Sequence, residues 1–306
     1  MNLYRYLIKN RTGMRMILLL LFLAIPMQVF TEPSEYGEKQ LVYAFEFLRF
    51  RAGQGEKTVL EVFSQIATDN LQFVKFKDGF YASYDLAITL YDQNESEVKS
   101  ANIIDSVKVQ TFDEIDLLRP PRLIRVAFLV ESGQYQARVK ITDLETLKEW
   151  KFEKTIHISD FGFSDIQLSD LQIATTITPT DEKNSLVKNN MKVIPNVQRI
   201  LGPQSNVLYV YSELYNLQLS EANPENRFIA IYTIHNKKGK EVKSMKLRYI
   251  KPGNTCVLNV EIPVDGLNEG LYQLKLTVTD LDNEQTVSQS TTFYVVNPDS
   301  KLLQKG

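Results

Sequence analysis

Apolar and polar residues alternate with a period of two over long stretches of the chain. The segment 272–279 reads YQLKLTVT, with an apolar side chain at every second position and a polar side chain between. The segment 135–142, YQARVKIT, has the same pattern. Such alternation predicts β-strands with one face on a core and the other in water. Further strands are predicted at 42–50, 59–66, 81–91, 123–130, 168–174, 207–214, 228–235, 256–262 and 290–296.

Several of these strings occur twice in the same order. VLEVFS at 59–64 is matched by VLYVYS at 207–212, and EVKS occurs at 97–100 and again at 241–244. GQYQARVKITDL at 133–144 is matched by GLYQLKLTVTDL at 270–281. No segment after the N-terminal region has a helical period. We therefore predict an all-β fold of two tandem immunoglobulin-like or fibronectin-III-like β-sandwiches, at 36–158 and 159–298.

A tyrosine begins the long alternating strand of each predicted unit. Tyr135 and Tyr272 both follow Gly-x and precede one further strand. In immunoglobulin-like sandwiches, a tyrosine at this position turns its hydroxyl back to the upstream backbone, which is called the tyrosine corner. We therefore predict that both tyrosines are structural.

The N-terminal region is typical of a secretory signal peptide. Residues 1–31 carry four basic residues and no acidic residue, and an apolar run follows the basic part. That run is shorter than the roughly 20 residues of a spanning helix. We predict that residues 1–31 are a signal peptide that is cleaved. The alternative is an uncleaved N-terminal anchor, which would then be the sole membrane contact. The expected location is the periplasm or outer cell envelope of a bacterium, and 299–306 is predicted to be a tail.

Charge and cysteine content narrow the function further. The net charge of −2 argues against nucleic-acid binding, which needs a clustered basic face. Cys256 is the one cysteine, so no disulfide forms within the chain, and it is predicted to be a small buried residue on a strand. Two histidines, His157 and His235, give no metal-binding pattern, and no cofactor motif is present.

Two acidic strings are weak candidates for metal binding or catalysis. DEID at 113–116 is predicted to lie in a loop, and DLDNE at 280–284 faintly resembles a calcium loop but lacks its glycine and spacing. A solvated hairpin turn is the preferred interpretation of DLDNE, because Asp and Asn suit turns. A hydrolase would need two carboxylates about 5–10 Å apart in one cleft, and the sequence shows no such pair.

Four strings together resemble a known family. FSDIQLSDLQIA at 163–174, KVIPNVQRILG at 192–202, LYVYSELYNL at 208–217 and GLYQLKLTVTD at 270–280 resemble the region before the terminal domain of GWxTD-domain proteins. The resemblance covers most of 40–297 and implies exported bacterial β-sandwich modules without an established activity. The one tryptophan, Trp150, lies in KEWKFEK and not in a Gly-Trp-x-Thr-Asp string, so the terminal domain is not expected in this chain.

The segment VLYVYSELYNL provides the candidate binding residues: Tyr209, Tyr211, Glu213 and Tyr215. If Leu208 points into the core, Tyr209 and Tyr211 share the opposite face. The matching face of the first unit includes Glu61, so this face is predicted not to be core. Exposed tyrosines suit a partner interface. The alternative is that this face packs against the segment 175–200, expected to contain an exposed loop at 175–190, or against the other unit.

These observations favour an exported protein that is not an enzyme and that acts as an interaction or scaffold element of the envelope. Its expected partner is an envelope protein. The alternative is a glycan-binding module, in which exposed aromatic rings would stack on sugars. The sequence leaves the partner, the oligomeric state and the signal cleavage site open.

Overall fold

The computed structural model describes residues 43–53, 57–117, 121–203, 205–220 and 225–297. All described residues belong to one compact unit, which lies within Glu38–Gly306. The predicted signal segment 1–31 and tail 299–306 lie outside the described residues. Within the described part of the chain, no helix is long and apolar enough to cross a membrane.

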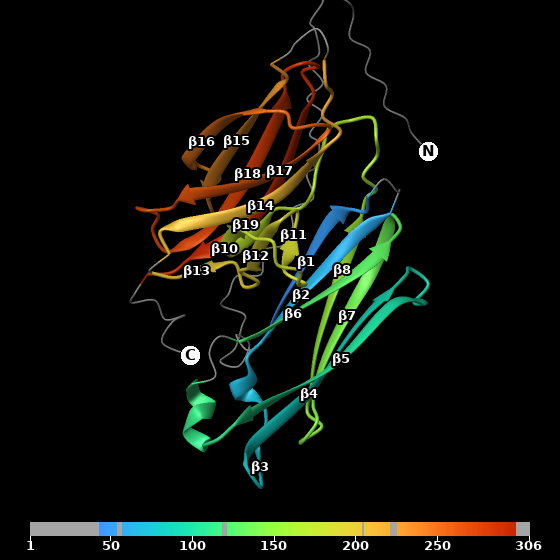
Figure 1. Ribbon diagram of the computed structural model, residues 1–306, viewed down its shortest axis with the longest axis vertical. Coiled ribbons are helices and arrows are strands. Elements are labelled where there is room, and N and C mark those ends of the chain that lie inside the picture. The colour runs from blue at the N-terminus through green and yellow to red at the C-terminus, as the bar shows by residue number, and fades with distance from the viewer. Residues whose placement is uncertain (1–42, 54–56, 118–120, 204, 221–224, 298–306) are drawn as a thin grey trace, which may run out of the picture. The chain divides into compact units, whose positions relative to one another are not determined.

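The strands of residues 43–158 form two antiparallel sheets, which we call the N-terminal sandwich (Figure 1). One sheet has the order β1-β2-β6, and the other has the order β3-β4-β7-β8 with β5 paired to β4. Its strands are β1 (Tyr43–Arg51), β2 (Thr58–Ile66), β3 (Val74–Phe76), β4 (Gly79–Tyr91), β5 (Glu97–Val109), β6 (Arg122–Val130), β7 (Gly133–Asp143) and β8 (Glu149–Ile158). Two short 3-10 helices, η3 (Thr68–Asn70) and η4 (Phe112–Leu117), interrupt the strands, and η4 contains the acidic string predicted to be a loop.

The strands of residues 167–295 form the C-terminal sandwich. One sheet has the order β11-β12-β10-β14-β17, with β9 paired to β14, and the other has the order β13-β19-β18-β15-β16. The strands of the first sheet are β9 (Gln167–Leu168), β10 (Gln172–Pro179), β11 (Val187–Lys188), β12 (Met191–Pro195), β14 (Val207–Tyr215) and β17 (Thr255–Pro263). Those of the second are β13 (Ile200–Leu201), β15 (Arg227–Asn236), β16 (Glu241–Ile250), β18 (Gly270–Asp280) and β19 (Thr286–Val295).

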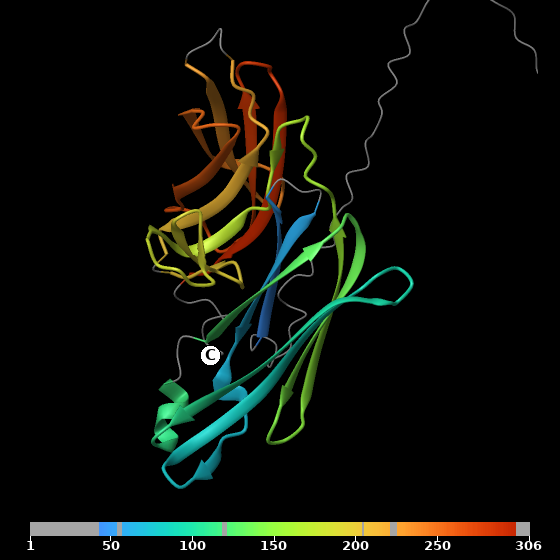
Figure 2. The same ribbon diagram turned by 45° about the vertical axis from the view of Figure 1, so that its right-hand side comes forward.

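Seven strands pair in the same way in both sandwiches, which explains the repeated sequence strings. Strand β2 lies between β1 and β6 as β14 lies between β10 and β17. Strand β4 lies between β5 and β7 as β15 lies between β16 and β18, and β7 pairs with β8 as β18 pairs with β19. The long antiparallel strands β4 and β5 are clear in Figure 2. The prediction of an all-β fold built from sandwiches is confirmed.

Each sandwich has its own apolar core between its two sheets. The N-terminal core joins side chains of β2, such as Leu60 and Val62, to side chains of β4 and β7, such as Leu86 and Val139. The C-terminal core joins β14 and β17 to β15, β18 and β19 in the same manner. The division into domains at 36–158 and 159–298 stays a prediction that unfolding experiments can test.

One local expectation, the exposed loop at 175–190, needs correction. Residues 175–179 continue strand β10 and residues 187–188 form β11, so 175–190 is not wholly a loop. Strand β10 pairs with β14 up to Ala174, and after a bulge between Ala174 and Thr176 its remaining residues pair only with β12. A polar, β-branched string is compatible with such a strand because one of its faces is exposed.

Candidate functional site

Strand β14 does not present an exposed row of tyrosines. Tyr211 is 0% exposed and Tyr215 is 4% exposed, while Tyr209 and Glu213 are half-buried. The expectation that Tyr211 and Tyr215 face a partner in solvent is therefore wrong. The alternative interpretation is correct, because this face of β14 packs against strands of the other sandwich and against the segment 186–197.

A third apolar cluster covers this face, and we call it the contact layer. Its buried members come from β1, β2, β10, β12, β14 and the loop after β12: Leu48, Phe50, Phe63, Ala174, Val193, Val197 and Tyr211. The rings of Phe50 and Tyr211 lie 6.2 Å apart. The contact layer thus joins residues of both sandwiches through apolar burial, which is the main favourable term in such packing.

A buried glutamate, Glu61 on β2, carries charge into the contact layer. Its Oε1 lies 2.6 Å from Nη2 of Arg125, and its Oε2 lies 2.9 Å from Nζ of Lys188. Burial acts to raise the pKa of the Glu61 carboxyl, but the charges of Lys188 and Arg125 outweigh burial and lower it. The glutamate had indicated an exposed face in the sequence, and its ion pairs are the reason that it is buried instead.

Glu213 accepts hydrogen bonds from the residues around it. The hydroxyls of Tyr211 and Tyr215 donate to its two carboxylate oxygens, each at 2.8 Å, and Asn189 Nδ2 donates at 2.9 Å. Burial raises the pKa of Tyr215, and the negative charge of Glu213 raises it further. Tyr215 also accepts the backbone N–H of Arg51 at 3.1 Å. Three of the four predicted residues are therefore brought together, as part of an internal network.

Arg49 and Asp170 form a second link between the sandwiches. The guanidinium of Arg49 donates from Nε to Oδ2 at 2.9 Å and from Nη2 to Oδ1 at 2.6 Å. The Arg49 backbone N–H also donates to Oδ2, at 2.8 Å, and Gln289 Nε2 donates to Oδ1 at 2.9 Å. Two parallel charged hydrogen bonds make this the geometrically most specific type of ion pair.

Glu46 on β1 is 1% exposed and faces Arg199, whose Nε donates to Oε1 at 2.9 Å. Its other oxygen, Oε2, has no hydrogen-bond partner among the described residues. Burial raises the pKa of the Glu46 carboxyl to about 7, although the charge of Arg199 acts in the opposite direction. The pKa of the Glu46 carboxyl therefore lies near neutral pH.

These buried charges were hard to predict from the sequence. Glu46, Glu61 and Asp170 stand among apolar residues in or beside strands, which is the one signal that was available. Their partners Lys188 and Arg199 lie far away in the chain, so pairing could not be inferred without the fold.

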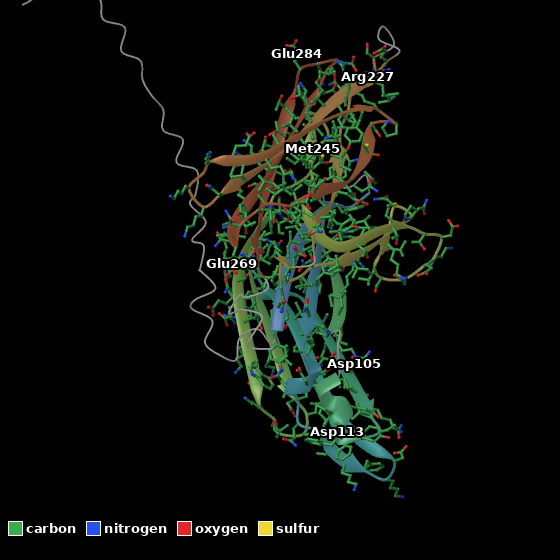
Figure 3. All side chains as sticks on the ribbon, turned by 90° about the vertical axis from the view of Figure 1, so that its left-hand side faces the viewer. Asp105, Asp113, Arg227, Met245, Glu269 and Glu284 are labelled. Carbon is green, nitrogen blue, oxygen red and sulfur yellow. The ribbon has the colours of Figure 1, made fainter. Side chains whose placement is uncertain are left out.

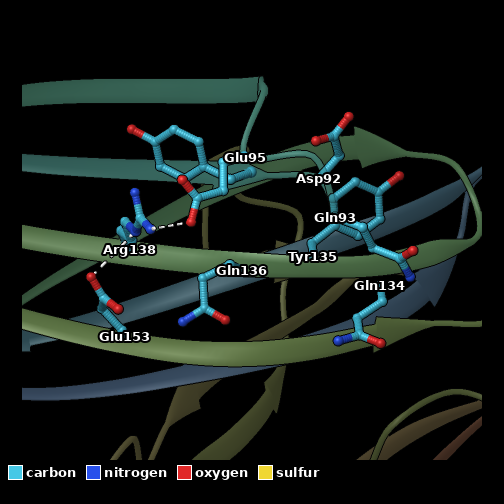
Figure 4. A pocket seen from close by; sticks show the side chains of 9 residues that line it. Asp92, Gln93, Glu95, Gln134, Tyr135, Gln136, Arg138 and Glu153 are labelled. Carbon is cyan, nitrogen blue, oxygen red and sulfur yellow. Dashed lines mark ion pairs between the residues drawn. The ribbon is translucent and has the colours of Figure 1, made fainter.

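A shallow polar pocket lies on the N-terminal sandwich, beside the turn between β4 and β5 (Figure 4). Its volume is about 250 Å³. It is lined by Tyr91, Asp92, Gln93, Glu95, Gln134, Tyr135, Gln136, Arg138 and Glu153. Arg138 Nε lies 3.2 Å from Glu153 and its guanidinium lies 4.5 Å above the Tyr91 ring, so one face of that ring is already covered.

Both predicted tyrosine corners are present. The Tyr135 hydroxyl donates to the Glu131 carbonyl at 3.1 Å, and the Tyr272 hydroxyl donates to the Asn268 carbonyl at 2.8 Å. Gly133 and Gly270, which precede them, have φ values of 156° and 152°. These values lie in a region that glycine enters easily and other residues avoid.

Metal binding has no support among the described residues, because no three His, Cys, Asp or Glu side chains are grouped to hold an ion. The string at 280–284 ends β18 and forms the turn to β19, as preferred; the turn residues 281–283 are half-buried and Glu284 is exposed. Asp280 is 0% exposed, and the ammonium of Lys251 stands where a cation would have to stand. Cys256 is half-buried at the start of β17.

Comparisons with known proteins give little guidance. No protein-family model matches the chain, and no curated protein matches it. Two crystal structures of Parabacteroides merdae β-glucuronidase, the second with glycerol in the active site, are similar over 80% of this chain and 28% of theirs. The identities are 11% and 12%, with TM-scores of 0.25 and 0.26. Likeness at these scores carries no argument about fold or activity.

Proposed function

We propose that this chain is an exported, non-enzymatic interaction or scaffold element of the bacterial cell envelope. The observation that supports the proposal best is the contact layer, which joins the two sandwiches through buried apolar residues and paired charges such as Glu61 with Lys188. Extensive apolar contact between two modules limits their relative motion, which suits a scaffold. The resemblance to the modules of GWxTD-domain proteins agrees with this role and with export.

The proposed partner surface is the aromatic tip, defined by Val74, Phe76, Phe80, Tyr81 and Phe112. Phe76 is 62% exposed and Phe112 is 65% exposed. The rings of Phe76 and Tyr81 lie 5.8 Å apart, and so do those of Phe80 and Phe112. Neighbouring residues of a strand point to opposite faces, so the tip is apolar on both sides. Exposed aromatic groups in close contact mark interaction sites more often than scattered apolar residues do.

A capture experiment tests this proposal. Residues 38–306 and the variant Phe76→Ser/Phe112→Ser are used as baits in native envelope extract. The matched control is Ile104→Ser/Ile250→Ser, because these side chains are 69% and 65% exposed at other places. One identifiable envelope protein should bind the unchanged bait and the control bait. The tip variant should fail to capture the same protein. Equal capture by all three baits would contradict the tip as the surface, and no specific capture would contradict the interaction role.

Glycan binding is the second candidate, and the pocket of Figure 4 is the observation that favours it. Side-chain amides of Gln134 and Gln136 and the carboxylates of Asp92 and Glu153 give it paired donors and acceptors for sugar hydroxyls. A panel of envelope polysaccharides tested with the unchanged chain and with Gln136→Ala would show binding that the substitution weakens. Binding to none of them would remove this candidate.

A further inference from the structure

A lysine and two aspartates lie together at one end of the C-terminal sandwich with almost no side-chain exposure to solvent. The side chains of Lys251 and Asp280 are 0% exposed, and that of Asp282 is 6% exposed. Lys251 Nζ lies 2.5 Å from Oδ1 of Asp280 and 2.5 Å from Oδ2 of Asp282, and it donates to the Gln218 carbonyl. Figure 3 marks this end of the sandwich through Arg227 at the start of β15 and Glu284 in the β18–β19 turn.

The surroundings of this cluster are apolar. Phe228, which is fully buried, pairs with Asp280 across β15 and β18 and with Tyr249 across β15 and β16. The Phe228 and Tyr249 rings stack with centroids 5.1 Å apart. Lys251 follows Tyr249 by two residues, so both side chains leave the backbone toward the core. Keeping one ammonium and two carboxylates charged in such a place costs free energy.

The turn itself does not need a lysine. In the N-terminal sandwich, Asp143 takes the same place at the end of β7, where it accepts the backbone N–H groups of Glu145 at 2.9 Å and Gln72 at 2.7 Å. Asp280 likewise accepts the N–H groups of Asp282 at 3.0 Å and Gln218 at 3.3 Å. The first turn forms with backbone donors, so the lysine at the second turn requires another explanation.

We propose that Lys251 and Asp280 form an intramolecular amide bond, with Asp282 as the group that carries the proton. The three requirements are a buried amine, a carboxyl carbon beside it and a second acid within hydrogen-bond distance of the nitrogen. All three are met here. The inference goes beyond the proposed function and does not depend on it.

The reaction is a condensation that needs no oxidant or cofactor. The ammonium gives one proton to the Asp280 carboxylate, the neutral Nζ then attacks Cγ of the protonated Asp280 carboxyl, and a carbon–nitrogen bond forms. The Asp282 carboxylate accepts the second proton from nitrogen and passes it to the departing oxygen. The carbon–oxygen bond breaks and one water molecule leaves. The net charge of the cluster is that of a single carboxylate both before and after the reaction. The difference is that one buried ammonium and one buried carboxylate are replaced by a neutral amide.

The bond would tie the end of β16 to the end of β18, which lie on either side of β15. Such a link resembles a disulfide in limiting the unfolded chain. The chain contains one cysteine, so it cannot form a disulfide within itself.

Mass spectrometry of the purified full chain, denatured before analysis, tests the proposal. A protease digest should yield a branched peptide that joins Lys251 to Asp280 and that is lighter by one water than the two linear peptides together. The variant Lys251→Arg keeps the charge but lacks the nucleophile, so it should yield only linear peptides. Recovery of linear peptides alone from the unchanged chain would overturn the proposal, whatever the variants do.

Two further comparisons separate this chemistry from nonspecific linkage. Asp282→Asn retains the size of the side chain but cannot carry the proton, so the branched peptide should fall at least tenfold. Lys108 Nζ also lies 2.5 Å from Oδ2 of Asp78, but these side chains are 40% and 62% exposed. This exposed pair should remain unlinked. A branched peptide at Lys108, or unchanged linkage in Asp282→Asn, would contradict the proposed role of burial and of Asp282.

Discussion

Lys188 Nζ lies 2.9 Å from Oε2 of Glu61, and the two residues belong to different sandwiches. The same ammonium lies 3.8 Å from the centroid of the Phe50 ring and 4.8 Å from that of Tyr211. An aromatic face attracts a cation, and this attraction strengthens when water is excluded. The lysine is therefore held by an anion and by two aromatic rings of the contact layer.

Removing Lys188 should destabilise the protein more than removing an exposed lysine does. Lys188→Met leaves the buried Glu61 carboxylate with Arg125 alone, and the expected loss is about 2–3 kcal/mol of unfolding free energy. Glu61→Gln in the same chain should recover part of this loss, because the unpaired charge disappears. Urea unfolding of the single and double variants gives the coupling energy.

Lys151→Met is the matched control, because Lys151 pairs with Glu149 at 2.8 Å while 68% exposed. It should cost at most about 0.5 kcal/mol. Equal losses for Lys188→Met and Lys151→Met would contradict the account of Lys188 as a largely buried partner of Glu61.

The raised pKa of Glu46 leads to a prediction about how the unfolding free energy depends on pH. Its pKa is about 7 in the folded chain against 4.5 as the ordinary value, so the folded state binds a proton more tightly than the unfolded state. Between these values the folded state holds the extra proton, and the unfolding free energy falls as pH rises toward about 7. Glu46→Gln removes this term. The stability of the variant relative to the unchanged chain should rise by up to about 3 kcal/mol from acid to neutral pH.

The measurement is urea unfolding of both proteins at several pH values. The groups that act on Glu46 in the folded state are Arg199, Lys188 and Asp170, and all three remain in the variant. Parallel stability curves for the two proteins would show that Glu46 does not titrate differently on folding.

The alternation of apolar residues was enough to predict most strands of both cores. It worked for β7 and β18 because one face of each is buried and the other is wet. It missed β5, β8 and β16, whose residues are largely exposed, since these strands pair along one edge only and bury few side chains. Their place in the sheets follows from backbone pairing with β4, β7 and β15, and backbone pairing leaves a weak trace in the sequence.

The surroundings of the candidate site residues were harder to predict, for a physical reason. A tyrosine on the outward face of a strand has the same sequence pattern whether it meets solvent or another module. Tyr211 meets the contact layer, because the face of β1 and β2 that carries Phe50 and Phe63 is also apolar. The tyrosine corners were predictable because each one is local. The donor and the acceptor of each hydrogen bond lie four residues apart in the sequence.

The two tyrosine corners should contribute separately to stability. Tyr135→Phe and Tyr272→Phe each remove one partly buried hydrogen bond and keep the ring, so each should cost about 1 kcal/mol. The residues belong to different cores, so the double variant should show the sum of the two losses. Tyr81→Phe is the control, because the Tyr81 hydroxyl bonds to the exposed Asp78 and its loss should cost little. A loss for Tyr81→Phe that matches the other two would contradict the structural role of the corners.

The contacts of Asp170 lead to a prediction about whether the two sandwiches unfold together. Its carboxylate accepts the Arg49 guanidinium, the Arg49 backbone N–H and the Gln289 amide. Asp170→Ala leaves these donors without their acceptor, and we expect a loss of about 3 kcal/mol. Because Arg49 belongs to the N-terminal sandwich and Gln289 to the C-terminal one, the loss should fall on the coupling between them. The unchanged chain should unfold in one transition, and Asp170→Ala should unfold in two.

Calorimetry and urea unfolding followed by tryptophan fluorescence distinguish these outcomes, because Trp150 reports on the N-terminal sandwich alone. Asp165→Ala is the matched control, since Asp165 precedes β9 and its carboxylate accepts an exposed hydrogen bond from Gln285 Nε2. It should retain the single transition. Two transitions in the unchanged chain would mean that the contact layer is too weak to couple the sandwiches, and the scaffold proposal would lose its support.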